Sequence, residues 1–195
     1  MPWADYKKDL LSPTFDPHRI LDQYFHTGQP VVFANTPREV EPKFKRKLAG
    51  DLQSIFGAQL HPLQLILCRS AHLGFSPVPG KNKLGRVFDP AKSDIDVAVV
   101  SAELFDSWWL DLQSCGLDQS ARDEISEDIF WGFISPDNVG SNSRFKRKWW
   151  KLFGDFETDY ANGVRGRLYR SYGAMQNYHL HAINGGRREL LGDRA

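Results

Sequence analysis

The sequence predicts an α+β fold in which a small mixed β-sheet is flanked by helices. Two short apolar runs, residues 63–68 and 95–100, are typical of strands that are buried on both faces. Apolar residues recur every three or four positions on either side of this pair, which indicates helices. A third and weaker strand candidate, residues 164–170, lies near the end of the chain. Helices that interrupt strands in this way are typical of α+β and α/β domains.

The size and composition of the chain indicate one compact unit. With 195 residues, of which 41% are hydrophobic, the chain can bury one ordinary core. We expect an N-terminal helical segment, residues 1–58, to pack on a core formed by residues 59–195. No apolar run approaches the roughly 20 residues that a membrane-spanning helix needs, so we expect no membrane partner. The opening residues do not resemble a secretion signal, which predicts a cytoplasmic protein.

Charge and cysteine content narrow the function classes. The 25 basic and 24 acidic residues give a net charge of +1, which argues against a surface that is basic throughout and binds nucleic acid everywhere. Cys68 and Cys115 lie far apart in the sequence, so neither a disulfide scaffold nor a cysteine zinc site is expected. His179 and His181 diverge on a predicted helix and do not suit a shared zinc ion.

Helix signals precede the first predicted strand. Asp16 and Pro17 are a typical helix start, and Gly28 is a candidate stop. Residues 30–34 are expected to be extended. A second helix is expected at residues 37–57, because its apolar residues recur at helical spacing.

The segments after the first strand are expected to alternate between loops and helices. A loop is predicted at residues 75–92, which are rich in proline and glycine, and a second loop at the polar residues 135–143. Helices are predicted at residues 101–113, 118–134, 145–160 and 172–184. The last helix is expected to end before a frayed tail.

Asp94 and Asp96 form a paired acidic cluster at the start of the second predicted strand. The side chains of a strand alternate between its faces, so residues two apart point the same way. Two carboxylates on one face are a donor set suited to Mg²⁺, which takes one or two carboxylates together with substrate phosphates. Acidic pairs also occur at strand ends for solubility alone, so the pair by itself leaves both interpretations open.

Two short motifs carry a family resemblance. Residues 93–96, SDID, and residues 69–74, RSAHLG, resemble the two signatures of the DNA polymerase beta-type nucleotidyltransferase superfamily, which includes small bacterial nucleotidyltransferase-like proteins. The resemblance covers residues 63–101. It implies a small mixed β-sheet of the polymerase beta nucleotidyltransferase type.

The resemblance also implies an activity and a set of site residues. The activity is the Mg²⁺- or Mn²⁺-dependent transfer of a nucleoside monophosphate from an NTP, in particular ATP, to a hydroxyl of a protein or nucleic acid. In this interpretation Asp94 and Asp96 are catalytic and bind the metal ions, which neutralise charge during in-line attack. Ser70, Gly74 and Ser93 bind the phosphates of the nucleotide.

Two departures from the family pattern add cationic candidates for phosphate binding. Arg69 stands where the family has a glycine, so it either turns inward as a phosphate ligand or obstructs the pocket. Residues 75–92 resemble an insertion, and its Lys81, Lys83 and Arg86 either bind the triphosphate or only keep the loop soluble. The predicted nucleotide site is therefore richer in cations than the family pattern.

The third carboxylate that active members of the family add from a later strand is not identified in this sequence. The strand candidate at residues 164–170 carries arginines instead. Loss of a general base lowers a rate by a factor of about 10²–10⁴. The alternative function is therefore a catalytically degenerate nucleotidyltransferase fold that acts as a nucleotide sensor or as a protein-interaction module of the antitoxin or defence type.

Basic and aromatic residues alternate at positions 144–151. We predict that Arg144, Lys146, Arg147 and Lys148 contact nucleic acid or an acidic protein partner. The alternative is a solvated amphipathic helix. Tryptophans in this run suit stacking on nucleobases, although tryptophans at helical spacing are more often core residues.

Overall fold

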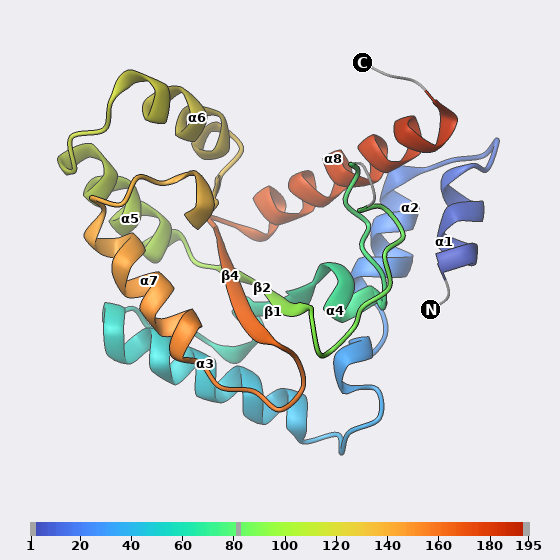
Figure 1. Cartoon of the computed structure of the whole chain (residues 1–195), viewed down its shortest axis with the longest axis horizontal. Coiled ribbons are helices and arrows are strands. Elements are labelled where there is room, and N and C mark those ends of the chain that lie inside the picture. The colour runs from blue at the N-terminus through green and yellow to red at the C-terminus, as the bar shows by residue number, and fades with distance from the viewer. Residues whose placement is uncertain (1–2, 81–82, 193–195) are drawn as a thin grey trace.

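A four-stranded mixed sheet lies at the centre of the chain (Figure 1). The computed structural model describes residues 3–80 and 83–192. The strand order is β1-β2-β4-β3; β2 and β4 are parallel, and the two outer pairs are antiparallel. The strands are β1 (Leu65–Cys68), β2 (Asp94–Val100), β3 (Phe133–Ile134) and β4 (Gly163–Tyr169). The predicted α+β class with a small mixed sheet is confirmed.

Helices surround this sheet on both faces (Figure 1). The α-helices are α1 (Trp3–Leu10), α2 (Pro17–Leu21), α3 (Val40–Phe56), α4 (Arg69–Leu73), α5 (Ala102–Ser114), α6 (Gln119–Phe130), α7 (Arg144–Asp155) and α8 (Tyr172–Leu191). Short helical turns of other types are η1 (Asp22–His26), η2 (Val31–Phe33), η3 (Pro62–Gln64) and η4 (Pro136–Asn138).

The alternation of side chains along β2 divides the interior into two layers. Ile95, Val97 and Val99 face the larger core, which is closed by apolar side chains of α3, α5 and α7. Ala98 and Val100 point the opposite way, into a smaller cluster that includes Met175 of α8. Asp94 and Asp96 belong to this second face, because they precede Ala98 and Val100 at the spacing of two residues that keeps strand side chains on one face. The acidic pair therefore lies on the α8 side of the sheet.

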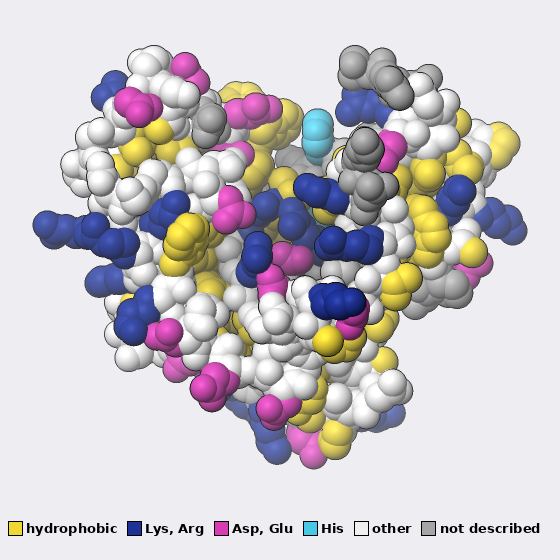
Figure 2. Space-filling view, in the orientation of Figure 1, with side chains coloured by type: hydrophobic (Ala, Val, Ile, Leu, Met, Phe, Trp, Pro, Cys, Tyr) yellow, Lys and Arg dark blue, Asp and Glu magenta, His cyan; other side chains and the backbone are white. Residues whose placement is uncertain are grey.

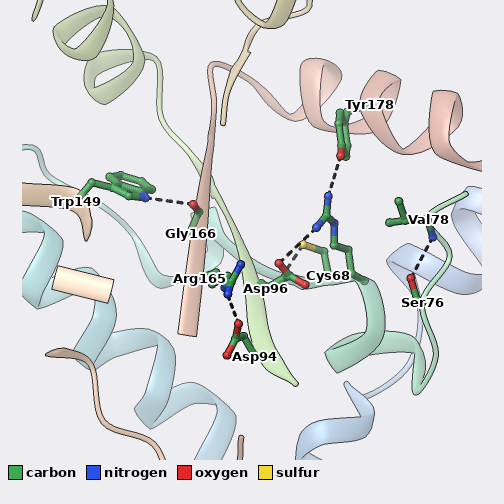
Figure 3. Close-up of polar contacts among 10 residues, drawn as sticks. Cys68, Ser76, Val78, Asp94, Asp96, Trp149, Arg165, Gly166 and Tyr178 are labelled. Carbon is green, nitrogen blue, oxygen red and sulfur yellow. Dashed lines mark hydrogen bonds and ion pairs between the residues drawn. The ribbon is translucent and has the colours of Figure 1, made fainter. Parts of the chain in front are cut away.

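β4 and α7 approach each other closely at Gly166. A Cβ atom at this position would overlap the ring of Phe153. The indole of Trp149 donates a hydrogen bond to the Gly166 carbonyl at 3.1 Å (Figure 3). A glycine in a strand interior often marks such a close approach. The lack of a side chain at Gly166 thus fixes the distance between the helix and the sheet.

The N-terminal helices pack on α8 around a separate apolar cluster. Tyr6, Tyr24 and Phe75 are buried in this cluster together with Ile183 of α8. Arg187 of α8 donates hydrogen bonds to the carbonyls at the end of α1, those of Leu10 and Ser12. α8 therefore connects the N-terminal segment to the sheet.

The segment between α4 and β2 is an irregular loop, as predicted for residues 75–92, and its described residues contact other parts of the fold. Phe75 and Val87 form an antiparallel bridge, and Gly80 N–H donates to the Glu189 carboxylate at 2.5 Å. The segment therefore folds back against the C-terminal end of α8. The basic residues Lys83 and Arg86 on this segment do not line the pocket beside Asp96, although the segment leads directly into β2 at Asp94.

Several predicted boundaries are wrong for identifiable reasons. Residues 30–34 were expected to be extended but contain the 3-10 turn η2. The helix predicted at 118–134 ends at Phe130, because Gly132 adopts a left-handed φ of 74° and leads into β3. The helix predicted to reach residue 160 ends at Asp155.

The last helix, α8, is longer than predicted, and the first helix, α1 (Trp3–Leu10), was not predicted. α8 continues through Gly185 and Gly186 to Leu191, where the prediction ended at residue 184. Gly186 is buried in α8 near Leu84 and Leu10, so the helix continues through it despite the low helix propensity of glycine. Within the described residues, no helix combines the length and the apolar character that a bilayer crossing requires.

We predict that Gly166→Ala destabilises the fold by about 1–3 kcal/mol, because the new methyl group must displace the Phe153 ring. Gly154→Ala is the matched control: a Cβ at Gly154 meets no atom within 4 Å, and alanine favours helices over glycine. Urea unfolding of the two variants tests this pair. Equal free energies of unfolding would contradict the close approach at Gly166.

Candidate functional site

The acidic pair lies beside arginines that β4 presents on the same face. In the parallel register, Asp94 is opposite Gly163, Asp96 is opposite Arg165, and Ala98 is opposite Arg167. Paired residues of neighbouring strands point to the same side of a sheet. Two carboxylates and two guanidinium groups are therefore brought onto one face by the pairing of two strands.

Asp94 has both carboxylate oxygens engaged. Arg165 Nε lies 2.5 Å from Asp94 Oδ2 (Figure 3), and Asn162 Nδ2 donates to Asp94 Oδ1 at 3.2 Å. The side chain of Arg165 is 69% exposed, whereas that of Asp94 is 20% exposed. The Arg165 guanidinium group is thus open to solvent while it contacts the Asp94 carboxylate.

Arg69 turns inward, toward the second aspartate. Its backbone adopts a left-handed φ of 55°, a conformation that glycine favours. One guanidinium nitrogen, Nη1, lies 3.6 Å from Asp96 Oδ1, and Nη2 donates to the Tyr178 hydroxyl at 2.9 Å. The Arg69 side chain therefore points inward, to Asp96 and Tyr178.

Arg167 completes the cationic group. Its guanidinium carbon lies 4.7 Å from the ring centroid of Tyr178 and 5.7 Å from that of Phe133, which are cation–π distances. Tyr178 on α8 therefore contacts Arg69 through its hydroxyl and Arg167 through its ring. The two arginines are held over the sheet from the α8 side.

Burial controls the electrostatics around Asp96. Burial raises the pKa of Asp96 above its ordinary value, although Arg69, Arg167 and Arg165 act in the opposite direction. Burial also raises the pKa of the neighbouring Cys68 thiol to about 12. A thiol with so high a pKa is a poor nucleophile. Cys68 is therefore a packing residue of this site.

These residues line a pocket of about 390 Å³. Its charged end consists of Asp96 with Arg69, Arg165 and Arg167, and its other end is aromatic. Figure 2 shows Lys and Arg side chains gathered around a hollow in the middle of this face, with acidic groups among them. The aromatic end and its rim are formed by Ser135, Pro136, Asp137, Trp149, Trp150, Phe153 and Gly154.

The turn residues predicted to bind phosphate lie outside this pocket lining. Ser70 lies in α4, and its carbonyl accepts a hydrogen bond from Gly74 N–H. Gly74 ends α4 with a φ of 83°. The Ser93 hydroxyl accepts a hydrogen bond from Asp89 N–H and stabilises the entry to β2. These three residues shape the backbone around the site, and Arg69 is the residue of this turn that reaches the pocket.

The cations predicted on the inserted segment are also separate from the pocket lining. Lys83 and Arg86 are exposed on the excursion that packs against α8. Lys81 lies outside the described residues. The cations of the pocket come from α4 and β4 instead.

Each carboxylate of the acidic pair is faced by a guanidinium group in the observed conformation. Asp94 and Asp96 are two carboxylates on one face, as Mg²⁺ requires, but guanidinium groups already face both of them. Within residues 3–80 and 83–192, no group of three or more His, Cys, Asp or Glu side chains forms a cluster that could hold a metal. A cation would have to displace Arg165 and Arg69 first.

Arg165 and Arg167 line the pocket, although they were not among the predicted site residues. The family pattern predicts an acid on this strand. The spacing of two between the arginines, on a strand parallel to the one with Asp94 and Asp96, is the signal that predicts a shared face. Tyr178 has no comparable local signal, because it joins the site from α8, whereas the basic and aromatic run at residues 144–151 already indicated Trp150 as a stacking candidate.

The basic run of α7 divides between its two faces. Arg144, Arg147 and Lys148 are exposed. Lys146 is 8% exposed, and its ammonium group donates to the Val139 carbonyl. Of the four basic residues predicted to contact a partner, Lys146 is therefore buried within the fold.

Comparisons of the chain with models of protein families, with curated proteins and with solved structures return no match.

We predict a histidine-dependent loss of stability at mildly acidic pH. Burial, with added repulsion from Arg69 and Arg167, lowers the pKa of His179 to about 3. Because the unfolded chain binds the proton from about pH 6.5 downward, stability is lost as pH falls toward 3, by about 2 kcal/mol near pH 5.

Urea unfolding at pH 7 and pH 5 measures this loss. We expect His179→Leu to remove most of the difference and His181→Leu, on the exposed side of α8, to retain it. An unchanged difference in His179→Leu would show that other groups cause the pH dependence.

Proposed function

We propose that the chain is a nucleotide-binding module with a nucleotidyltransferase-like site, in which arginines rather than metal ions hold the phosphates. The observation that carries this proposal is the pocket itself. One end presents Arg69, Arg165 and Arg167, and the other presents aromatic side chains. A ligand that fits both ends has an anionic group and a planar apolar group, which is the chemistry of a nucleotide.

The arginine end suits a polyphosphate. Guanidinium groups form bidentate, charge-assisted hydrogen bonds with phosphate oxygens. In the free protein, Asp94 faces Arg165 and Asp96 faces Arg69, whereas Arg167 lies over the rings of Tyr178 and Phe133. Arg165 is largely exposed, so it can turn from Asp94 to a phosphate at little steric cost. The carboxylates therefore hold Arg165 and Arg69 ready for an anionic ligand.

The aromatic end suits a nucleobase. Trp150 is 53% exposed and lines the pocket beside Phe153 and Gly154. Base stacking on an aromatic ring contributes about 1–3 kcal/mol and tolerates any base. The volume of about 390 Å³ lies within the range of small-molecule pockets.

The same geometry favours binding over transfer. A metal-dependent transferase needs free carboxylates, and it typically adds a third acid to activate the attacking hydroxyl. Arg165 stands opposite Asp96, where the neighbouring strand would present that acid. This register supports the degenerate interpretation.

A Mg²⁺-dependent nucleotidyltransferase is the second candidate, and one observation favours it. Asp94 and Asp96 share one face at the start of β2, in the arrangement suited to the metal. An incoming triphosphate could draw Arg165 and Arg69 away and leave both carboxylates free. Metal dependence separates the two candidates.

We predict that ATP binds in the presence of EDTA. Arg165→Ala should weaken binding by about 10-fold or more, because a charge-assisted hydrogen bond contributes about 1.5–3 kcal/mol. Arg170→Ala is the control. Arg170 directly follows β4 and is exposed, but it pairs with Asp106 and does not line the pocket. Isothermal titration calorimetry with and without Mg²⁺ gives both affinities.

Two results would overturn the proposal. One is no ATP binding under either condition. The other is binding only with Mg²⁺, accompanied by transfer of label from α-labelled ATP that is lost in Asp94→Asn/Asp96→Asn; this result supports the transferase instead.

We predict that Arg69→Gly separates nucleotide affinity from stability. Glycine adopts the φ of 55° without strain, so the free energy of unfolding should change little while ATP binding weakens by about 10-fold or more. Arg69→Ala removes the same guanidinium group but retains the backbone strain, which makes it the matched comparison. Equal ATP affinity in wild type and both variants would exclude Arg69 from the site.

A further inference from the structure

The outer surface of α7 carries a row of cations that the pocket does not use. Arg144, Arg147, Lys148 and Lys151 are exposed on this helix, and we refer to them as the α7 basic face. The opposite side of the helix is anchored in the main core by Phe145, Trp149, Leu152 and Phe153. The basic face is thus presented on a rigid element.

Most of this charge is uncompensated. Lys151 pairs with Asp155 at 2.9 Å. Within the described part of the chain, no carboxylate lies within ion-pair distance of Arg144, Arg147 or Lys148. The chain as a whole carries a net charge of +1. Three unpaired cations on one helix face of an almost neutral protein create a local positive potential that attracts anionic groups.

An exposed aromatic side chain borders the same face. Trp150 is 53% exposed and lies one helical turn beyond Arg147. The buried Lys146 ammonium group lies 4.3 Å from the centroid of the Trp150 ring, which fixes the position of the indole. A fixed, half-exposed indole beside free cations combines the two groups that contact single-stranded nucleic acid, a stacking platform and cations for the backbone.

We infer that the α7 basic face binds single-stranded nucleic acid, with phosphates on Arg144, Arg147 and Lys148 and an unpaired base stacked on Trp150. The helix has 12 residues and is therefore about 18 Å long, which is enough for a few nucleotides. The three cations lie outside the pocket lining, whereas Trp150 belongs to it, so this contact shares the Trp150 ring with the proposed nucleotide site.

The aromatic component selects this partner over an acidic protein. An acidic peptide would be attracted by the cations alone, whereas stacking on Trp150 requires a planar base. A duplex keeps its bases paired and offers none to the indole. The dependence of binding on Trp150 therefore identifies the class of partner.

Fluorescence polarisation with a labelled 12-nucleotide RNA and the DNA of the same sequence tests the inference between 50 and 200 mM salt. We expect a slope of about −2 in log affinity against log salt, from about −0.7 for each of three phosphates. Trp150→Ala should weaken binding by about 5-fold or more, and Arg147→Glu/Lys148→Glu should abolish it. Lys7→Glu/Lys8→Glu makes the same change in net charge on exposed residues of α1, far from α7 in Figure 1, and should retain binding.

The outcomes separate this inference from the nucleotide site. Arg165→Ala should leave oligonucleotide affinity unchanged even where it weakens ATP binding. No oligonucleotide binding at 50 mM salt would overturn the inference, and so would equal binding by Arg147→Glu/Lys148→Glu. Tight binding of a polyglutamate peptide that ignores Trp150→Ala would assign the face to an acidic protein partner instead.

Discussion

The parallel pairing of β2 with β4 determines the chemistry of this molecule. It is the one parallel contact among the described strands, and it sets Asp96 opposite Arg165 and Ala98 opposite Arg167. A shift of the register by one residue would turn both arginines to the opposite face and into the main core. Gly166, between them, allows α7 to pack closely enough to form the aromatic wall of the pocket. Two of the pocket arginines and the close approach of the aromatic wall therefore both depend on β4.

The site is stable because its opposite charges compensate one another. A buried or half-buried charge is costly unless it is paired. Asp94 is paired with Arg165, and Asp96 faces Arg69. In the proposed function, a phosphate group would compete with these carboxylates for the arginines.

The sequence predicted the sheet because its signals are local. Continuous apolar runs identify β1 and β2, and alternation predicts that Asp94 and Asp96 share a face. The inward position of Arg69 and the contact of Tyr178 with two arginines could not be predicted, because they depend on how α8 crosses the sheet. The continuation of α8 through Gly185 and Gly186 was missed for a related reason: propensity is local, whereas the packing of Gly186 on Leu84 and Leu10 involves distant parts of the chain.

Tyr178 also makes α8 a mechanical link between the charged pocket and the N-terminal helices. At one end, the helix is attached to the sheet region through guanidinium contacts with Arg69 and Arg167. Toward its other end, Arg187 and Glu189 attach it to α1 and to the excursion between α4 and β2. Apolar packing of Met175 and Tyr178 on Ala98 and Val100 adds to the first attachment. The tightness with which α8 lies on the sheet therefore depends both on this packing and on what the arginines contact.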